Sequence, residues 1–114
     1  MRSKITIFIA VFFLAQYSYA EEWYQGGNLQ GSTLHKWAIS SERNKLATAS
    51  DWIVIVLGES QVRNMNTLKK KANVLVNCVD TLVPVISKSY DPRETKTTST
   101  ALLCIKQLEA NSWR

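Results

Sequence analysis

The chain has 114 residues, of which 46% are hydrophobic and 20% charged, and its formal net charge is +5. This length fits one small domain, and one histidine with two cysteines gives too few ligands for a structural zinc site, which takes about four. The sequence also has no glycine-rich phosphate loop and no nucleophile-elbow motif, so we expect neither a metal nor another cofactor.

Residues 1–20 have the pattern of a secretory signal peptide. Arg2 and Lys4 precede the apolar run ITIFIAVFFLA, and the small residues at positions 18 and 20 suit cleavage after Ala20. The run is shorter than the about 20 residues of a membrane-spanning helix, which disfavours the alternative of a retained anchor. We therefore expect an exported protein, periplasmic or secreted, that consists of residues 21–114 and makes no stable membrane insertion.

The beginning of the mature chain is predicted to be irregular. Residues 21–32 carry three of the four glycines, so we expect an arm that is anchored by the apolar side chains of Trp23 and Tyr24. Thr33–Ile39 can form a short helix capped by Ser32 or Thr33, because an N-cap hydroxyl accepts a hydrogen bond from a free backbone amide.

Glu42–Leu57 is predicted to be the first long helix, with a cap at Ser40 or Ser41 and a stop at Gly58. Its apolar face would consist of Leu46, Ala49, Ile53, Val56 and Leu57. The run WIVIVL is unbroken and rich in β-branched residues, so a buried strand is a real alternative. We favour a helix because the preceding NKLATASD suits one and the sequence offers no second strand for pairing.

The clearest helical pattern runs from Asn66 to about Val83. Apolar residues recur there at spacings of 4, 3, 4, 3 and 4, which predicts a single buried stripe of Leu68, Ala72, Leu75, Val79, Leu82 and Ile86. Asn66 is the expected N-cap. Pro84 lacks a backbone donor and clashes with the preceding turn, so the helix should kink or end near it.

A last helix is predicted to begin at Asp91. Aspartate is a good N-cap, Pro92 suits the first helical position, and Glu94 can return a hydrogen bond to the cap. The inner face of this helix would consist of Thr97, Ala101, Cys104, Ile105 and Leu108. The sequence thus predicts an all-α fold, a small bundle of three main helices plus a short N-terminal helix.

Cys78 and Cys104 are expected to form a disulfide bond. Each lies 13 residues from Asp91 and flanks the apolar side of its helix, so the two would lie level in an antiparallel hairpin of the last two helices. An exported chain meets an oxidising compartment, where such a bond persists; two buried free thiols are the alternative. A loop of this size would stabilise the fold by roughly 3 to 4 kcal/mol.

Seven residues are candidates for contact with a partner: Trp23, Tyr24, His35, Lys69, Lys70, Lys71 and Trp113. The three lysines could face an anionic partner, with a solvated helix face as the structural alternative. The three aromatic residues lie near the ends of the mature chain, where they could be exposed or could anchor the termini. The histidine has no activated nucleophile marked beside it, so a hydrogen bond to a backbone carbonyl is its simpler role.

A series of short motifs occurs in a fixed order between Trp23 and Trp52. They are WYxGG at 23–27, TLH at 33–35, Trp37, NKLAT at 44–48 and DW at 51–52. This ordered pattern resembles that of small exported bacterial proteins of uncharacterised activity. The likeness covers about a third of the mature chain, and it implies no activity, cofactor or partner.

We predict that the chain is not an enzyme but a periplasmic protein-binding module, an inhibitor or immunity-type factor whose partner is another protein of the cell envelope. The prediction depends on a disulfide-stapled scaffold with spare aromatic side chains and no catalytic or metal-binding motif. Two alternatives stay open: a small envelope enzyme that uses His35, and a binder of anionic envelope surfaces that uses Lys69, Lys70 and Lys71. Loss of Arg2 and Lys4 lowers the formal charge to +3, so no nucleic-acid partner is expected.

Overall fold

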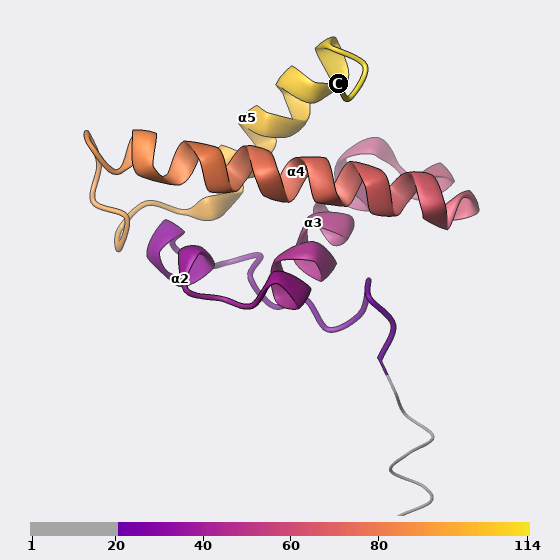
Figure 1. The fold of residues 1–114 in the computed structure, drawn as a ribbon, viewed down its shortest axis with the longest axis horizontal. Coiled ribbons are helices and arrows are strands. Elements are labelled where there is room, and N and C mark those ends of the chain that lie inside the picture. The colour runs from indigo at the N-terminus through magenta and orange to yellow at the C-terminus, as the bar shows by residue number, and fades with distance from the viewer. Residues whose placement is uncertain (1–20) are drawn as a thin grey trace, which may run out of the picture.

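The computed structural model describes residues 21–114, and the predicted signal peptide lies outside the described residues. Within this range the fold is all-α, with four α-helices, one 3-10 helix and no strand. Figure 1 shows α4 (Met65–Ile86) lying across the middle, with α2 (Leu34–Ala38) and α3 (Glu42–Leu57) on one side. Helix α5 (Thr97–Ala110) rises from the other side of α4. No helix of residues 21–114 is both long and apolar enough to cross a membrane.

Helices α2 and α3 confirm the predicted elements, and each has a hydroxyl cap. The Thr33 hydroxyl accepts a hydrogen bond from the Lys36 amide, and the Ser41 hydroxyl accepts one from the Asn44 amide. Helix α3 ends at Gly58, whose φ of 100° lies in the region that favours glycine. The strand alternative for WIVIVL is therefore wrong.

The predicted apolar face of α3 is only partly correct. Ala49 and Ile53 are buried as expected, but Val56 is exposed and Trp52 is buried in its place. The Trp52 ring stacks on Trp37 of α2, with ring centroids 5.5 Å apart. Because WIVIVL is apolar in every direction, its periodicity could not show which face would be buried.

Helix α4 begins at Met65, one residue earlier than predicted, and ends at Ile86. Its N-cap is Asn64, whose side chain accepts a hydrogen bond from the Thr67 amide, and not Asn66. The helix continues through Pro84 and ends two residues after it, at Ile86, which agrees with the expected end near Pro84 and lies slightly beyond Val83. The predicted apolar stripe is confirmed, and its first four members are fully buried: Leu68, Ala72, Leu75 and Val79.

The predicted start of the last helix at Asp91 is wrong. Asp91 instead closes a turn, in which its side chain accepts from the Arg93 amide and its carbonyl accepts from the amides of Glu94 and Thr95. Helix α5 begins at Thr97, and its predicted inner face is buried throughout.

The N-terminus of α5 is capped by a distant segment of the chain. The Thr97 amide donates to the Ser32 carbonyl over 2.9 Å, and the Leu34 amide donates to the Thr95 carbonyl over 2.9 Å. These bonds flank an isolated antiparallel bridge between Thr33 and Lys96. Lys96 is extended, which prevents the turn at Asp91 from continuing into α5.

The predicted disulfide between Cys78 and Cys104 is present and joins α4 to α5, with Cα atoms 6.1 Å apart. Cys78 lies eight residues before the end of α4, and Cys104 lies seven residues after the start of α5. The two cysteines are equally distant from Asp91, and this spacing predicted the disulfide correctly because the connection between α4 and α5, residues 87–96, is centred near Asp91. No helix starts at Asp91 itself.

Candidate functional site

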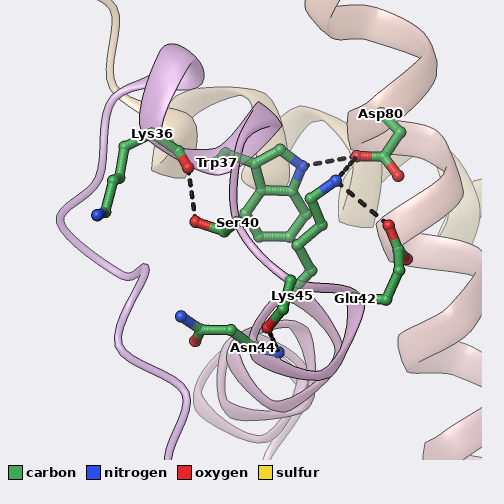
Figure 2. Close-up of polar contacts among 8 residues, drawn as sticks. Lys36, Trp37, Ser40, Glu42, Asn44, Lys45 and Asp80 are labelled. Atoms are coloured by element: carbon green, nitrogen blue, oxygen red, sulfur yellow. Dashed lines mark hydrogen bonds and ion pairs between the residues drawn. The ribbon is translucent and has the colours of Figure 1, made fainter.

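A buried polar cluster joins α2, α3 and α4. The indole Nε1 of Trp37 and the Nζ of Lys45 both donate to the same oxygen, Oδ1 of Asp80, over 2.8 and 3.1 Å (Figure 2). Lys45 Nζ also lies 3.4 Å from Glu42 and 5.8 Å from the centroid of the Trp37 ring. The Lys45 side chain is only 7% exposed, so its charge depends on these partners.

This cluster has the properties of a structural element. Its buried donors have partners, and neither Lys45 nor Asp80 lines any of three well-formed hollows of the described residues. A reacting group would have no access to the Lys45 amine, which is already engaged by two carboxylates. The cluster therefore fixes the short helix α2 against the two long helices.

An open apolar groove of about 550 Å³ lies between the arm, the second half of α3, the 3-10 helix η1 (Glu59–Arg63) and the start of α4. Its volume is in the range of ordinary ligand-binding sites. We call it the Asp51 groove, and it is lined by Tyr24, Gln30, Ser50, Asp51, Val54, Ile55, Val62, Met65 and Leu68. Ile55 is 74% exposed and Val62 48% exposed, so large apolar side chains project at its rim.

The polar groups of this groove gather around Asp51. Gln30 Nε2 donates to Asp51 Oδ2 over 2.8 Å and to the Gly27 carbonyl over 3.0 Å, which ties the carboxylate to the arm. Burial raises the pKa of Asp51 above its ordinary value, and the hydrogen bond from Gln30 opposes this shift. A carboxylate with a burial-shifted pKa in an apolar hollow makes the groove a candidate functional site.

The structure places four of the residues predicted to bind a partner in two separate lysine–tryptophan pairs. Lys69 Nζ lies 5.7 Å from the Trp23 ring centroid, and Lys71 Nζ lies 5.4 Å from that of Trp113. Lys71 also donates to Gln61 on η1 over 2.9 Å. Two of the three lysines thus hold the arm and the C-terminal residues against α4 by cation–π contacts.

A second hollow of about 500 Å³ lies beside Trp113. Lys70, Lys71 and Glu109 are the charged residues that line it, so it carries both signs of charge. The indole Nε1 of Trp113 is buried and has no hydrogen-bond partner among residues 21–114. Ser112 and Trp113 both have positive φ, at 56° and 62°, so the backbone is held in an unfavourable conformation to place this ring.

His35 stands apart from the other predicted residues. It is exposed on α2, and its side chain makes no hydrogen bond within residues 21–114. Trp37, two residues after His35, contacts α4 at Asp80, which lies about 16 Å along that helix from Lys69. Tyr24, in contrast, packs edge-to-face on Trp23 and lines the Asp51 groove.

The sequence-based prediction missed the centre of the groove, Asp51 and Gln30, and also the η1 helix that forms one wall. A signal for Asp51 was present, because it is a single acid directly before WIVIVL and its neighbours one turn later are Val54 and Ile55. No signal in the sequence pointed to Gln30, because its contact with Asp51 spans 21 residues and depends on the path of the arm.

Comparison of the chain with protein-family models, curated protein sequences and solved structures finds no match. The function therefore has to be argued from the geometry of this chain.

Proposed function

We propose that the chain is an exported, non-catalytic protein-binding module of the cell envelope, an inhibitor or immunity-type factor that docks its partner in the Asp51 groove. The disulfide supports export, since such bonds persist in oxidising compartments. The groove lies on α3 and the start of α4; the Lys45–Asp80 ion pair joins these two helices, and the disulfide joins α4 in turn to α5.

The observation that carries the proposal is the exposed apolar surface around the groove. Ile55 and Val62, which line the groove, are 74% and 48% exposed, and Val56, next to Ile55 in the chain, is 44% exposed. Apolar surface that continues beyond a hollow is more extensive than a small ligand would cover, and it is typical of protein–protein contact.

The environment of His35 supports a non-catalytic role. A general base needs a group that orients its ring, and a nucleophile within hydrogen-bond reach. Among residues 21–114, the His35 side chain has neither a carboxylate nor a hydroxyl bonded to it, and it lines none of the hollows described above.

The proposal is tested by site-specific photocrosslinking in cells. With p-benzoylphenylalanine at Ile55, we expect one discrete heteromeric adduct, whereas the same residue at Leu102, which is 47% exposed on α5, should give none. Val62→Glu should remove the adduct without changing the melting temperature, because it places a charge in the apolar rim. The matched variant Val85→Glu, also at an exposed valine, should leave the adduct intact.

Absence of any adduct at Ile55, or an adduct that Val62→Glu leaves unchanged, would show that the groove is not a docking site. An adduct of equal yield at Leu102 would show non-specific contact and would have the same consequence.

A second candidate function, binding to an anionic envelope surface, has one observation in its favour. Trp23 lies beside Lys69 and Trp113 lies beside Lys71, and Lys–Trp groupings are typical of peripheral membrane contact. It predicts cosedimentation with phosphatidylglycerol vesicles that the triple substitution Lys69→Ala, Lys70→Ala and Lys71→Ala abolishes. Cosedimentation that survives this substitution would exclude a role for these lysines.

A further inference from the structure

Asp51 is a negative charge without a cation in the described part of the chain. The ion pairs within residues 21–114 engage the acids Glu21, Glu42 and Asp80, and none of them reaches Asp51. Tyr24 is the other ionisable residue that lines the groove, and it carries no positive charge. The groove thus presents an uncompensated carboxylate surrounded by apolar side chains.

The carboxylate is also held in place for a contact. Gln30 is the one side chain of the described residues that donates to it, and this bond goes to Oδ2. The second oxygen, Oδ1, accepts no hydrogen bond from residues 21–114 and has a free acceptor site. Because Gln30 is anchored in turn to the Gly27 carbonyl, the orientation of the carboxylate is fixed before any partner binds.

The arrangement of α3 places apolar contacts beside this acceptor. Val54 and Ile55 lie three and four residues after Asp51, and therefore on the same face of the helix. Val62 and Met65 face them from η1 and the start of α4. A partner that fills this space needs an apolar side chain, with a positively charged donor within a few ångströms of it.

Resting on the protein-binding function proposed above, we infer that the Asp51 groove selects a partner segment that carries a lysine or arginine next to an aliphatic or aromatic side chain. The cation would donate to Asp51 Oδ1, and the apolar side chain would pack on Val54, Ile55 and Val62. A charge-assisted hydrogen bond in a partly desolvated groove is stronger than a neutral one, so the preference for the cation is about tenfold or more.

The test uses the purified protein and two probe peptides, acetyl-Leu-Lys-Leu-amide and acetyl-Leu-Gln-Leu-amide. Methyl NMR titration should show shifts at Val54, Ile55 and Val62 at about tenfold lower concentration of the lysine peptide. Asp51→Asn should abolish this difference between the two peptides. Glu59→Gln removes the same charge from an exposed residue that does not line the groove, so it should leave the difference unchanged.

Equal binding of the two peptides to the unmodified protein would overturn the inference. So would a preference that survives Asp51→Asn, or one that Glu59→Gln reduces as strongly, since the selectivity would then come from the general surface charge. If hexylammonium ion shifts the groove methyl groups and neither peptide does, the site takes a small cation, which also overturns it. Each of these results can occur while the Ile55 adduct still forms in cells, so failure of the inference is separable from failure of the docking function.

Discussion

Asp51 and Asp80 are both partly buried carboxylates on long helices, and they have opposite surroundings. Asp80 accepts from an indole and an ammonium group, so its charge is compensated and the contact is structural. Asp51 accepts from a neutral amide and has no cation within the described residues, so its charge is unfavourable for folding. A residue that weakens the fold and lines a groove is a candidate for a role in binding.

At the residue scale, Asp80→Ala should be strongly destabilising. It leaves Lys45, whose side chain is 7% exposed, without its closest anionic partner, and it leaves the Trp37 Nε1 without an acceptor. Because Asp80 itself is 35% exposed, we expect a loss of about 2 to 3 kcal/mol in the free energy of unfolding, measured by urea denaturation.

The control for this prediction is Glu42→Ala, which removes the other carboxylate near Lys45. Glu42 is 78% exposed, so solvent screening limits the effect to about 0.5 kcal/mol. Equal losses for the two variants would contradict the structural role of Asp80.

Asp51→Asn should raise the stability of the folded protein at neutral pH. Burial raises the folded-state pKa of Asp51 above its unfolded value of 3.8, so the folded state binds the proton more tightly. The ionised carboxylate therefore destabilises the folded state at pH values above the folded-state pKa. This destabilisation disappears as the pH falls below 3.8, where the group is protonated in both states. Asparagine keeps an acceptor for Gln30 and has no charge to desolvate.

The measurement is the melting temperature of both proteins from neutral pH to pH 3. The gain from Asp51→Asn should be largest at neutral pH and should shrink as Asp51 takes up its proton. A gain that is constant with pH would show that the carboxylate is not the cause.

At the scale of elements, the arm and α3 meet backbone to backbone at Gly27. A Cβ atom at this position would lie 2.7 Å from the carbonyl carbon of Ala47 and would also contact the Thr48 amide. The arm then runs on to Leu29, which is fully buried and whose amide donates to the Thr48 hydroxyl over 3.2 Å. The predicted anchors Trp23 and Tyr24 are only half-buried, so Leu29 is the deeper contact.

Gly27→Ala should therefore push the arm away from α3 and cost about 1 to 3 kcal/mol in the free energy of unfolding. Gly31→Ala is the matched control, because no atom lies within 4 Å of a Cβ there. Chemical denaturation of the two variants distinguishes them, and a neutral Gly27→Ala would contradict the close approach of the two backbones.

The packing of the arm on α3 also gives a structural reason for several residues of the motifs between Trp23 and Trp52. Gly27 permits the close contact, Asn44 pairs with Asn28, and Thr48 accepts from the Leu29 amide. In the DW motif, Asp51 lines the groove and Trp52 stacks on Trp37 in the core. The motifs at 23–27 and 44–48 thus meet where the arm covers α3, whereas TLH and Trp37 belong to α2, which contacts α4 and residues 92–95.

At the scale of the whole molecule, the disulfide contributes a large part of the free energy of unfolding. A domain of fewer than 100 residues buries a small core, so its total stability is about 5 to 10 kcal/mol. The double variant Cys78→Ala and Cys104→Ala should lose about 3 kcal/mol, because the bond closes a loop of 26 residues. In the presence of a reductant, the urea midpoint of the unmodified protein should fall to that of the double variant. Detection of two free thiols in the native protein by mass spectrometry would contradict the disulfide bond.

The sequence by itself determined the all-α class, the hydroxyl caps of α2 and α3, the buried stripe of α4 and the disulfide. These features depend on spacing and on neighbours within one helical turn, or on an arithmetic relation between two cysteines. They could be predicted because the physical interactions that produce them are local or strongly constrained.

The tertiary structure alone decided where α5 begins, which face of α3 is buried, and where the groove lies. Asp91 has every local signal of a helix start, yet hydrogen bonds from Thr97 to Ser32 and from Leu34 to Thr95 flank Lys96, which is extended and separates the turn at Asp91 from α5. The Asp51 groove joins the arm, α3, η1 and α4, whose residues are up to 44 positions apart in the chain. Such contacts leave no period or cap in the sequence, because the free energy that stabilises them comes from packing between distant segments.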